Sequence, residues 1–252
     1  MAPAAVAVAF AFGLLIGSFL NVVAHRLPRG ESVVTPGSRC PGCGHAVRPY
    51  DNIPVLSWLL LRGRCRDCGE AISWRYPLVE LVTAVLWAAV VAVRDDAGSI
   101  ALGLILVTAL VPIVLIDLDR RLIPNLITGP AAVVAVAAGL ALDRHGVPEQ
   151  LIAGAAAGGF FLLAALAYPR GMGMGDVKLA GLMGLCLGSA VAAALLVGLL
   201  AGVVVGGVII ARLGARVGRK VAVPFGPFLA LGAVVALFAG DAIVHAYTQH
   251  FL

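Results

Sequence analysis

Charged and aromatic side chains are scarce in this chain. Only 12% of its 252 residues are Asp, Glu, Lys or Arg and only 6% are aromatic, whereas 61% are hydrophobic. A soluble domain of this length needs a largely polar surface, so the composition argues against the soluble globular class. Stretches of about 20 apolar residues cross a bilayer as helices, and the composition therefore predicts a polytopic membrane protein.

The apolar stretches also lack any alternation between apolar and polar residues, which argues against a transmembrane β-barrel. Continuous runs of Ala, Val, Leu and Gly instead predict an all-α fold with about eight transmembrane helices. The sixth and seventh are separated only by Gly188 and Ser189, so these two could be miscounted. The expected spans are residues 4–24, 77–93, 100–116, 126–142, 151–168, 177–189, 190–211 and 225–247.

The first apolar stretch has no basic leading region and no cleavage site, so we expect a retained span rather than a signal peptide. The only sizeable polar stretch follows it. We therefore expect three parts: a first transmembrane helix at residues 1–25, a small extramembrane domain at 26–76 and a transmembrane core at 77–252.

Positive charge falls almost entirely in alternate loops. With eight spans, one set of loops holds 16 of the 18 Lys and Arg residues, and the opposite set holds only Arg94 and Arg144, beside several acidic residues. Because loops rich in Lys and Arg stay in the cytoplasm, this bias predicts that residues 26–76, Asp117 and Asp176 share the cytoplasmic face. The net charge of +5 fits contact with anionic lipid headgroups and requires no nucleic-acid partner.

The polar domain contains four of the five cysteines, arranged as two Cys-x-x-Cys pairs. Cys40 and Cys43 form the first pair, Cys65 and Cys68 form the second, and 21 residues separate the pairs. Four thiolates in this pattern are typical of a closed, tetrahedral structural zinc site. Disulfides or a redox pair are the alternatives, but a cytoplasmic location argues against persistent disulfides. Cys186 falls within a span and is expected to be a small buried apolar residue.

Two acidic clusters lie at the ends of apolar segments. The sequence GMGMGD at 171–176 places Asp176 before one segment, and Asp117 and Asp119 end another. Ionisable groups at the edge of a bilayer are costly and therefore indicate a functional site. If Asp117 and Asp176 meet, they form the apparatus of aspartyl proteolysis, in which two carboxylates share a proton and activate water. Asp176 could instead only cap the helix that follows it.

Several motifs along the chain resemble, in order, those of bacterial type IV prepilin peptidases, which belong to the GxGD class of membrane aspartyl proteases. Together they span nearly the whole chain, so chance is not a serious alternative. The motifs are GSFLNVVAHRLP at 17–28, the two cysteine pairs, RYPLVEL at 75–81, the Asp117 region ending in IPN at 123–125, GMGDVK at 173–178 and PFGPFLA at 224–230.

The resemblance implies roles for particular residues. Asp117 and Asp176 match the two catalytic aspartates of the family, and Asp119 is the local rival to Asp117. We expect three neighbours of Asp176 to support the catalytic loop. Two are glycines that let the loop approach a substrate backbone closely, and the third is a lysine that would meet a lipid phosphate or the substrate: Gly173, Gly175 and Lys178.

The resemblance also implies a reaction and its partners. Such enzymes remove the basic leader from type IV prepilins or type II secretion pseudopilins at the cytoplasmic face of the bacterial inner membrane. Many also methylate the new N-terminus with S-adenosylmethionine, and those that do typically keep the four cysteines, as this chain does. The chain has no glycine-rich loop of the Rossmann kind, so the residues that would bind this cofactor stay unassigned.

Three alternatives from other classes can be weighed against this interpretation. The chain could be a different GxGD intramembrane protease, or a non-enzymatic membrane assembly factor that uses a zinc domain for docking. A transporter would place its acidic groups near the middle of the bilayer rather than at the ends of spans.

Overall fold

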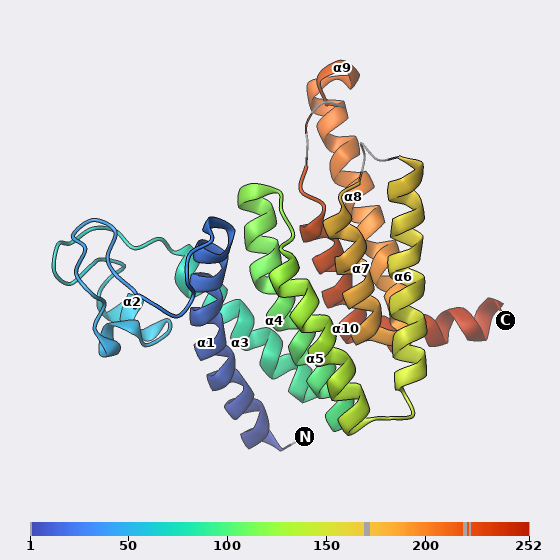
Figure 1. The fold of residues 1–252 in the computed structure, drawn as a ribbon, viewed down its shortest axis with the longest axis horizontal. Helices are drawn as coiled ribbons and strands as arrows, with labels where there is room; N and C mark the ends of the chain where they lie inside the picture. The colour runs from blue at the N-terminus through green and yellow to red at the C-terminus, as the bar shows by residue number, and fades with distance from the viewer. Residues whose placement is uncertain (1, 169–171, 219–220, 222, 252) are drawn as a thin grey trace. The chain divides into compact units, whose positions relative to one another are not determined.

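Most of the residues that the structure describes are helical and none of them forms a strand, which confirms the all-α prediction. The computed structural model describes residues 2–168, 172–218, 221 and 223–251, with side chains described as far as residue 240. The helices in Figure 1 are α1 (Pro3–Arg26), α2 (Leu56–Leu60), α3 (Arg75–Val93), α4 (Ala97–Arg120), α5 (Asn125–Leu142), α6 (Val147–Ala167), α7 (Met174–Leu187), α8 (Val191–Leu213), α9 (Ala215–Gly218) and α10 (Gly226–Phe251).

Six helical stretches among the described residues are long and apolar enough to cross a membrane, as expected of a multi-pass protein. The predicted count of eight spans is not confirmed. The sixth stretch, Met174–Leu213, joins α7 and α8, although the chain leaves α7 at Gly188, where φ is 57°. α7 alone has 14 residues, and its length of about 21 Å falls short of a hydrocarbon core of roughly 30 Å. The apolar helix at Gly226–Gly240 is also short.

The chain separates into two compact units, which meet in sequence between Asp95 and Asp96. The first unit contains α1, the cysteine-rich segment and α3. The division that we expect at residues 25 and 76 stays a prediction.

α1 and α3 pack closely because two glycines leave no side chain between them. A Cβ atom at Gly13 would lie 2.6 Å from the Cα of Ala84, and one at Gly17 would lie 2.7 Å from the Cα of Glu80. The four-residue spacing puts both glycines on one face of α1. Small residues at such a crossing bring helices into van der Waals contact, which stabilises helix pairs in lipid.

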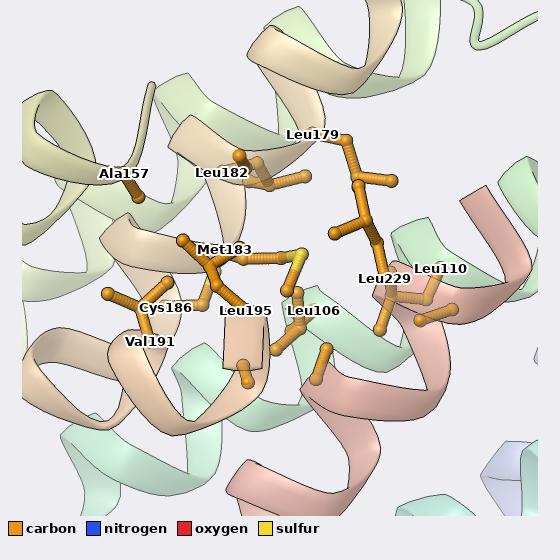
Figure 2. Close-up of a cluster of buried hydrophobic side chains, with 14 of the residues drawn as sticks. Leu106, Leu110, Ala157, Leu179, Leu182, Met183, Cys186, Val191, Leu195 and Leu229 are labelled. Atoms are coloured by element: carbon orange, nitrogen blue, oxygen red, sulfur yellow. The ribbon is translucent and has the colours of Figure 1, made fainter. Parts of the chain in front are cut away.

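The second unit is a bundle in which α7 contacts α4, α5, α6, α8 and α10. Its core consists of buried apolar side chains. Figure 2 shows Met183 of α7 among Leu106 of α4, Leu195 of α8 and Leu229 of α10. Cys186 belongs to the same core, in agreement with the sequence-based expectation. The bundle therefore holds the first turn of α7, which carries Asp176, on a rigid support.

Replacing Gly17 by Ala should lower the thermal stability of the protein, because the new methyl group would meet the backbone of α3 and force the helices apart. The control is Gly159→Ala in α6, where a Cβ meets nothing within 4 Å and Ala is the better helix former by about 1 kcal/mol. Thermal unfolding in detergent should give a lower Tm for Gly17→Ala only. Equal Tm values for the two variants would contradict the close crossing.

Candidate active site and metal centre

Asp117 lies in the last turn of α4 and is buried, with only 5% of its surface exposed. Asp119, two residues later, is exposed. α4 ends directly after these residues because Arg121 adopts a left-handed conformation with φ of 55°, and its N–H donates to the carbonyl oxygen of Asp117 at 2.8 Å. The charge of Arg121 also acts on the Asp117 carboxylate. Of the two rival aspartates, only Asp117 faces the interior of the bundle.

Asp176 occupies the first turn of α7 and does cap that helix. Its Oδ2 accepts a hydrogen bond from the N–H of Gly173 at 3.2 Å, and its own N–H donates to the carbonyl oxygen of Gly173 at 3.1 Å. This reciprocal pair of bonds fixes the carboxylate relative to the helix. Capping uses one carboxylate oxygen, and Asp176 stays only half-buried.

The structure places the two predicted aspartates at the ends of two helices that contact each other. Asp117 at the end of α4 and Asp176 at the start of α7 are close enough for the charge of Asp117 to act on Asp176. The approach of α7 depends on Gly175, because a Cβ atom there would lie 2.8 Å from the Cβ of Ile123. A glycine at this position therefore lets the start of α7 pack on the chain that follows α4. Gly171 of the same loop lies outside the described residues.

A third segment completes the surroundings of Asp117. The N–H of Gly226, at the start of α10, donates to Asp117 Oδ2 at 2.9 Å, and this bond is buried. A Cβ at Gly226 would lie 2.8 Å from the same oxygen, so only glycine fits without moving the carboxylate. Phe225 stacks on Phe161 of α6, with ring centroids 6.2 Å apart, and so anchors the turn. Sequence reasoning noted the PFGPFLA motif but assigned Gly226 no role.

Lys178 lies on the exposed side of α7, one turn beyond Gly175. Its Nζ donates to the Oδ1 of Asn125, the first residue of α5, at 2.7 Å. The two residues belong to the GMGDVK and IPN motifs. The contact therefore links two motifs that lie 53 residues apart in the sequence. Lys178 therefore ties α7 to α5 beside the aspartates.

The four cysteines of the polar segment also come together. The ligand atoms of Cys40, Cys43, Cys65 and Cys68 all lie within 4.8 Å of one another, which is close enough for all four to hold one metal ion. Between residues 30 and 74, only Ser57 and Gly63 are buried. A segment with so small an apolar core depends on another source of folding free energy, such as a bound metal.

The two cysteine pairs have the same backbone geometry. The N–H of Cys40 donates to the carbonyl oxygen of His45, and the N–H of Cys65 donates to that of Glu70, at 3.0 and 2.8 Å. Each pair is followed by a glycine with a positive φ, 73° in the first and 74° in the second. Other residues rarely adopt this backbone conformation. The glycines are Gly44 and Gly69.

The electrostatics of the cluster suit a cation. Backbone N–H groups of Cys68 and Asp67 donate to the sulfur of Cys65 and lower its pKa to about 7. A bond from the N–H of Glu70 lowers the pKa of Cys68, but desolvation and the neighbouring sulfurs outweigh it and raise this pKa to about 12. Four sulfurs this close repel one another as thiolates, so a bound cation is what allows all of them to ionise.

Ion pairs link the two halves of this segment. The Arg66 guanidinium donates three hydrogen bonds to Asp51, which lowers the pKa of that carboxyl group, and Arg48 pairs with Asp67 at 3.0 Å. The pair of Arg48 with Asp67 is largely at the surface, where such pairs stabilise little, whereas the Asp51 side chain of the other pair is only 9% exposed. The ion pairs orient the segment around the cysteines, but they do not supply the folding free energy of a hydrophobic core.

Two family descriptions match the chain. They are "Bacterial Peptidase A24 N-terminal domain" over residues 11–94 and "Type IV leader peptidase family" over residues 104–211. A prepilin leader peptidase/N-methyltransferase from Aeromonas hydrophila is 37% identical in an alignment 276 residues long, gaps included. The alignment covers 96% of this chain and 93% of that relative. The chain belongs to the type IV leader peptidase family.

Relatives in other bacteria carry the same name. The protein from Pseudomonas aeruginosa is 34% identical over 269 residues, covering 94% of this chain and 91% of that relative. The protein from Myxococcus xanthus is 41% identical over 185 residues, which cover 71% of this chain but only 55% of that relative. No solved structure gives a significant match. The matches confirm the family resemblance that the motifs indicated.

Purified from its membrane, this leader peptidase family member should carry about one metal ion per chain, because the four cysteines form one closed set of ligands. The double variant Cys40→Ser/Cys43→Ser should lose the metal, whereas Cys186→Ser, which alters only the core, should retain it. Elemental analysis by inductively coupled plasma mass spectrometry measures both the amount and the element. Full metal content in the double variant would refute this ligand set.

Proposed function

We propose that this chain cleaves the leader peptide of type IV prepilins or type II secretion pseudopilins by a two-aspartate mechanism. The observation that carries the proposal is that Asp117 and Asp176 lie at the ends of two contacting helices, near enough for their charges to interact, and that each carboxylate accepts a backbone N–H. The names of the relatives supply the prepilin substrate, and the family resemblance of the motifs adds the pseudopilins.

The chemistry follows from two carboxylates that share one proton. The ionised carboxylate takes a proton from water, whose oxygen attacks the scissile carbonyl carbon, while the protonated carboxyl group donates to the carbonyl oxygen. Collapse of the tetrahedral intermediate breaks the C–N bond, and a proton passes to the departing amine. The pair titrates as one unit, so neither residue is assigned a fixed role. The N–H groups of Gly226 and Gly173 hold the carboxylates in place for this exchange.

We also propose N-methylation of the new N-terminus with S-adenosylmethionine. This part rests on the printed names of the relatives, which pair the peptidase with an N-methyltransferase. When bound, S-adenosylmethionine would supply the methyl group.

The metal of the cysteine cluster is, in this proposal, a structural zinc ion. Zinc prefers four thiolates in tetrahedral arrangement, and a site with four protein ligands leaves no position for water or substrate. Zinc would thus stabilise the segment between α1 and α3 and take no direct part in peptide hydrolysis.

We place the protein in the bacterial inner membrane with the aspartates and the cysteine segment on the cytoplasmic side. The distribution of Lys and Arg between alternate loops supports this orientation. A leader in the cytoplasm would then reach the aspartates while the apolar helix of the precursor stays in the bilayer.

The proposal is tested by incubating the purified protein with a full-length prepilin precursor and analysing the products by mass spectrometry. Loss of the leader reports the peptidase, and an added methyl group, seen only with S-adenosylmethionine present, reports the transferase. Asp117→Asn and Asp176→Asn should each slow cleavage by about 1,000-fold or more, because each removes one member of the proton-sharing pair. Asp119→Asn is the matched control, since its carboxylate is exposed and should leave cleavage near the parent rate.

Two outcomes would count against this assignment. Cleavage that survives in Asp117→Asn but is lost in Asp119→Asn would show that the wrong aspartate was chosen. Absence of cleavage by the parent protein, with several precursors and full metal content, would favour the assembly-factor alternative.

Gly226→Ala should slow cleavage by about 100-fold, because the methyl group would displace the Asp117 carboxylate and small misplacements of reacting groups are costly. Gly206→Ala in α8 is the control, since a Cβ there meets nothing within 4 Å. Initial rates at equal membrane abundance give the comparison. A parent-like rate in Gly226→Ala would show that this contact does not position Asp117.

A further inference from the structure

The first unit carries an exposed apolar surface outside the sites described so far. It is formed by α2 and the residues before it, and we call it the α2 surface: Ile53, Leu56, Leu59 and Leu60. Leu60 is 73% exposed and Leu59 is 58% exposed. Large side chains of this kind cluster on a surface where a partner or a lipid phase covers them.

The opposite face of α2 is fixed to the rest of the first unit. The Oγ of Ser57 donates to the carbonyl oxygen of Tyr50 at 2.7 Å, and Nε1 of Trp58 donates to that of Ile72 at 3.0 Å. Gly63 gives Trp58 its space, because a Cβ there would lie 2.9 Å from the indole ring. The polar contacts thus face the cysteine segment, and the leucines must face away from it.

A hydrogen bond to α3 ties α2 to a membrane span. The N–H of Val55, directly before α2, donates to Oε2 of Glu80 at 2.8 Å. Glu80 belongs to α3, a candidate span, and follows Tyr76 by four residues, or about 6 Å along the helix. Trp74 and Tyr76, both exposed, mark the start of this span, and such aromatic residues gather at membrane interfaces. The hydrogen bond therefore ties the start of α2 to the second turn of this span, next to its interfacial aromatic residues.

The two spans of the first unit also carry exposed apolar side chains, among them Phe19 of α1 and Leu81 of α3. Such side chains of a membrane span face lipid. The hydrogen bond from Val55 to Glu80 attaches the start of α2 to one of these spans.

The charges next to α2 suit a lipid headgroup. Arg62 and Arg64 follow α2 and are exposed, and residues 53–64 contain no acidic side chain. Leucines flanked by arginines are typical of segments that lie in the interface of a membrane with anionic lipids.

We propose that α2 lies in the plane of the membrane, with Leu56, Leu59 and Leu60 inserted among the acyl chains of the leaflet on the side of the cysteine segment. Arg62 and Arg64 bind anionic headgroups there. This contact anchors the metal-binding segment to the lipid surface at a second point besides its two flanking helices. It does not depend on the proposed enzymatic function.

The test is photocrosslinking in the full-length protein. Leu60 is replaced by the photoreactive residue p-benzoyl-phenylalanine, and the protein is reconstituted in vesicles of phosphatidylethanolamine and phosphatidylglycerol. The control carries the same residue at His45, which is exposed in the first cysteine loop. Metal content equal to that of the parent shows that each variant is folded. After irradiation, mass spectrometry should find lipid adducts at residue 60, at least about tenfold more than at residue 45.

Other results would overturn the proposal. Equal lipid adducts at the two positions would mean that α2 is not inserted. Adducts at residue 60 to the chain's own second unit would show that protein, not lipid, covers the α2 surface. If added prepilin precursor became the main adduct and replaced lipid, the surface would be a substrate-docking site instead.

Discussion

A carboxylate at the end of an apolar helix loses hydration, and hydrogen-bond donors must replace the lost water. The bond from Gly226 to Asp117 meets this requirement with a backbone group from a segment 109 residues away in sequence. It requires a glycine, since a side chain would occupy the position of the carboxylate oxygen. The end of α4, the start of α10 and the packing of Phe225 on α6 therefore depend on one another.

The same logic applies at the start of α7. Asp176 holds the N-terminus of that helix through Gly173, while Gly175 lets the turn approach Ile123 closely enough for the two carboxylates to interact. Capping and catalysis are compatible, because a carboxylate has two oxygens and the cap uses one. Gly175 of this loop is therefore needed for close packing against Ile123, and not only for backbone flexibility.

Much of this could be predicted from the sequence because particular side chains carry the information. The spacing of two Cys-x-x-Cys pairs is enough to predict a metal site. The family motif distinguishes Asp117 from Asp119, and the structure agrees, since Asp117 is buried and Asp119 is exposed. The donor to Asp117 could not be predicted, because every residue except proline has a backbone N–H and only the fold brings one near. The bond between Lys178 and Asn125 was hidden for a related reason, since nothing in either loop indicates that the two loops are neighbours.

The division between α7 and α8 and the overlooked α2 show what hydropathy detects. Hydropathy alone joins α7 to α8, although the chain leaves α7 at Gly188, beside the boundary that we expect between the sixth and seventh spans. α2 has five residues, too few for any periodicity to emerge.

The central claim is that Asp117 and Asp176 act as one proton-sharing unit. It is tested most directly by single-turnover cleavage rates for the parent, Asp117→Asn, Asp176→Asn and the double variant, each with enzyme in excess over precursor. The account predicts that the double variant is no slower than the slower single variant, within about threefold, because either substitution already removes the whole unit. Losses that multiply in the double variant would show two independent contributions and would contradict the account.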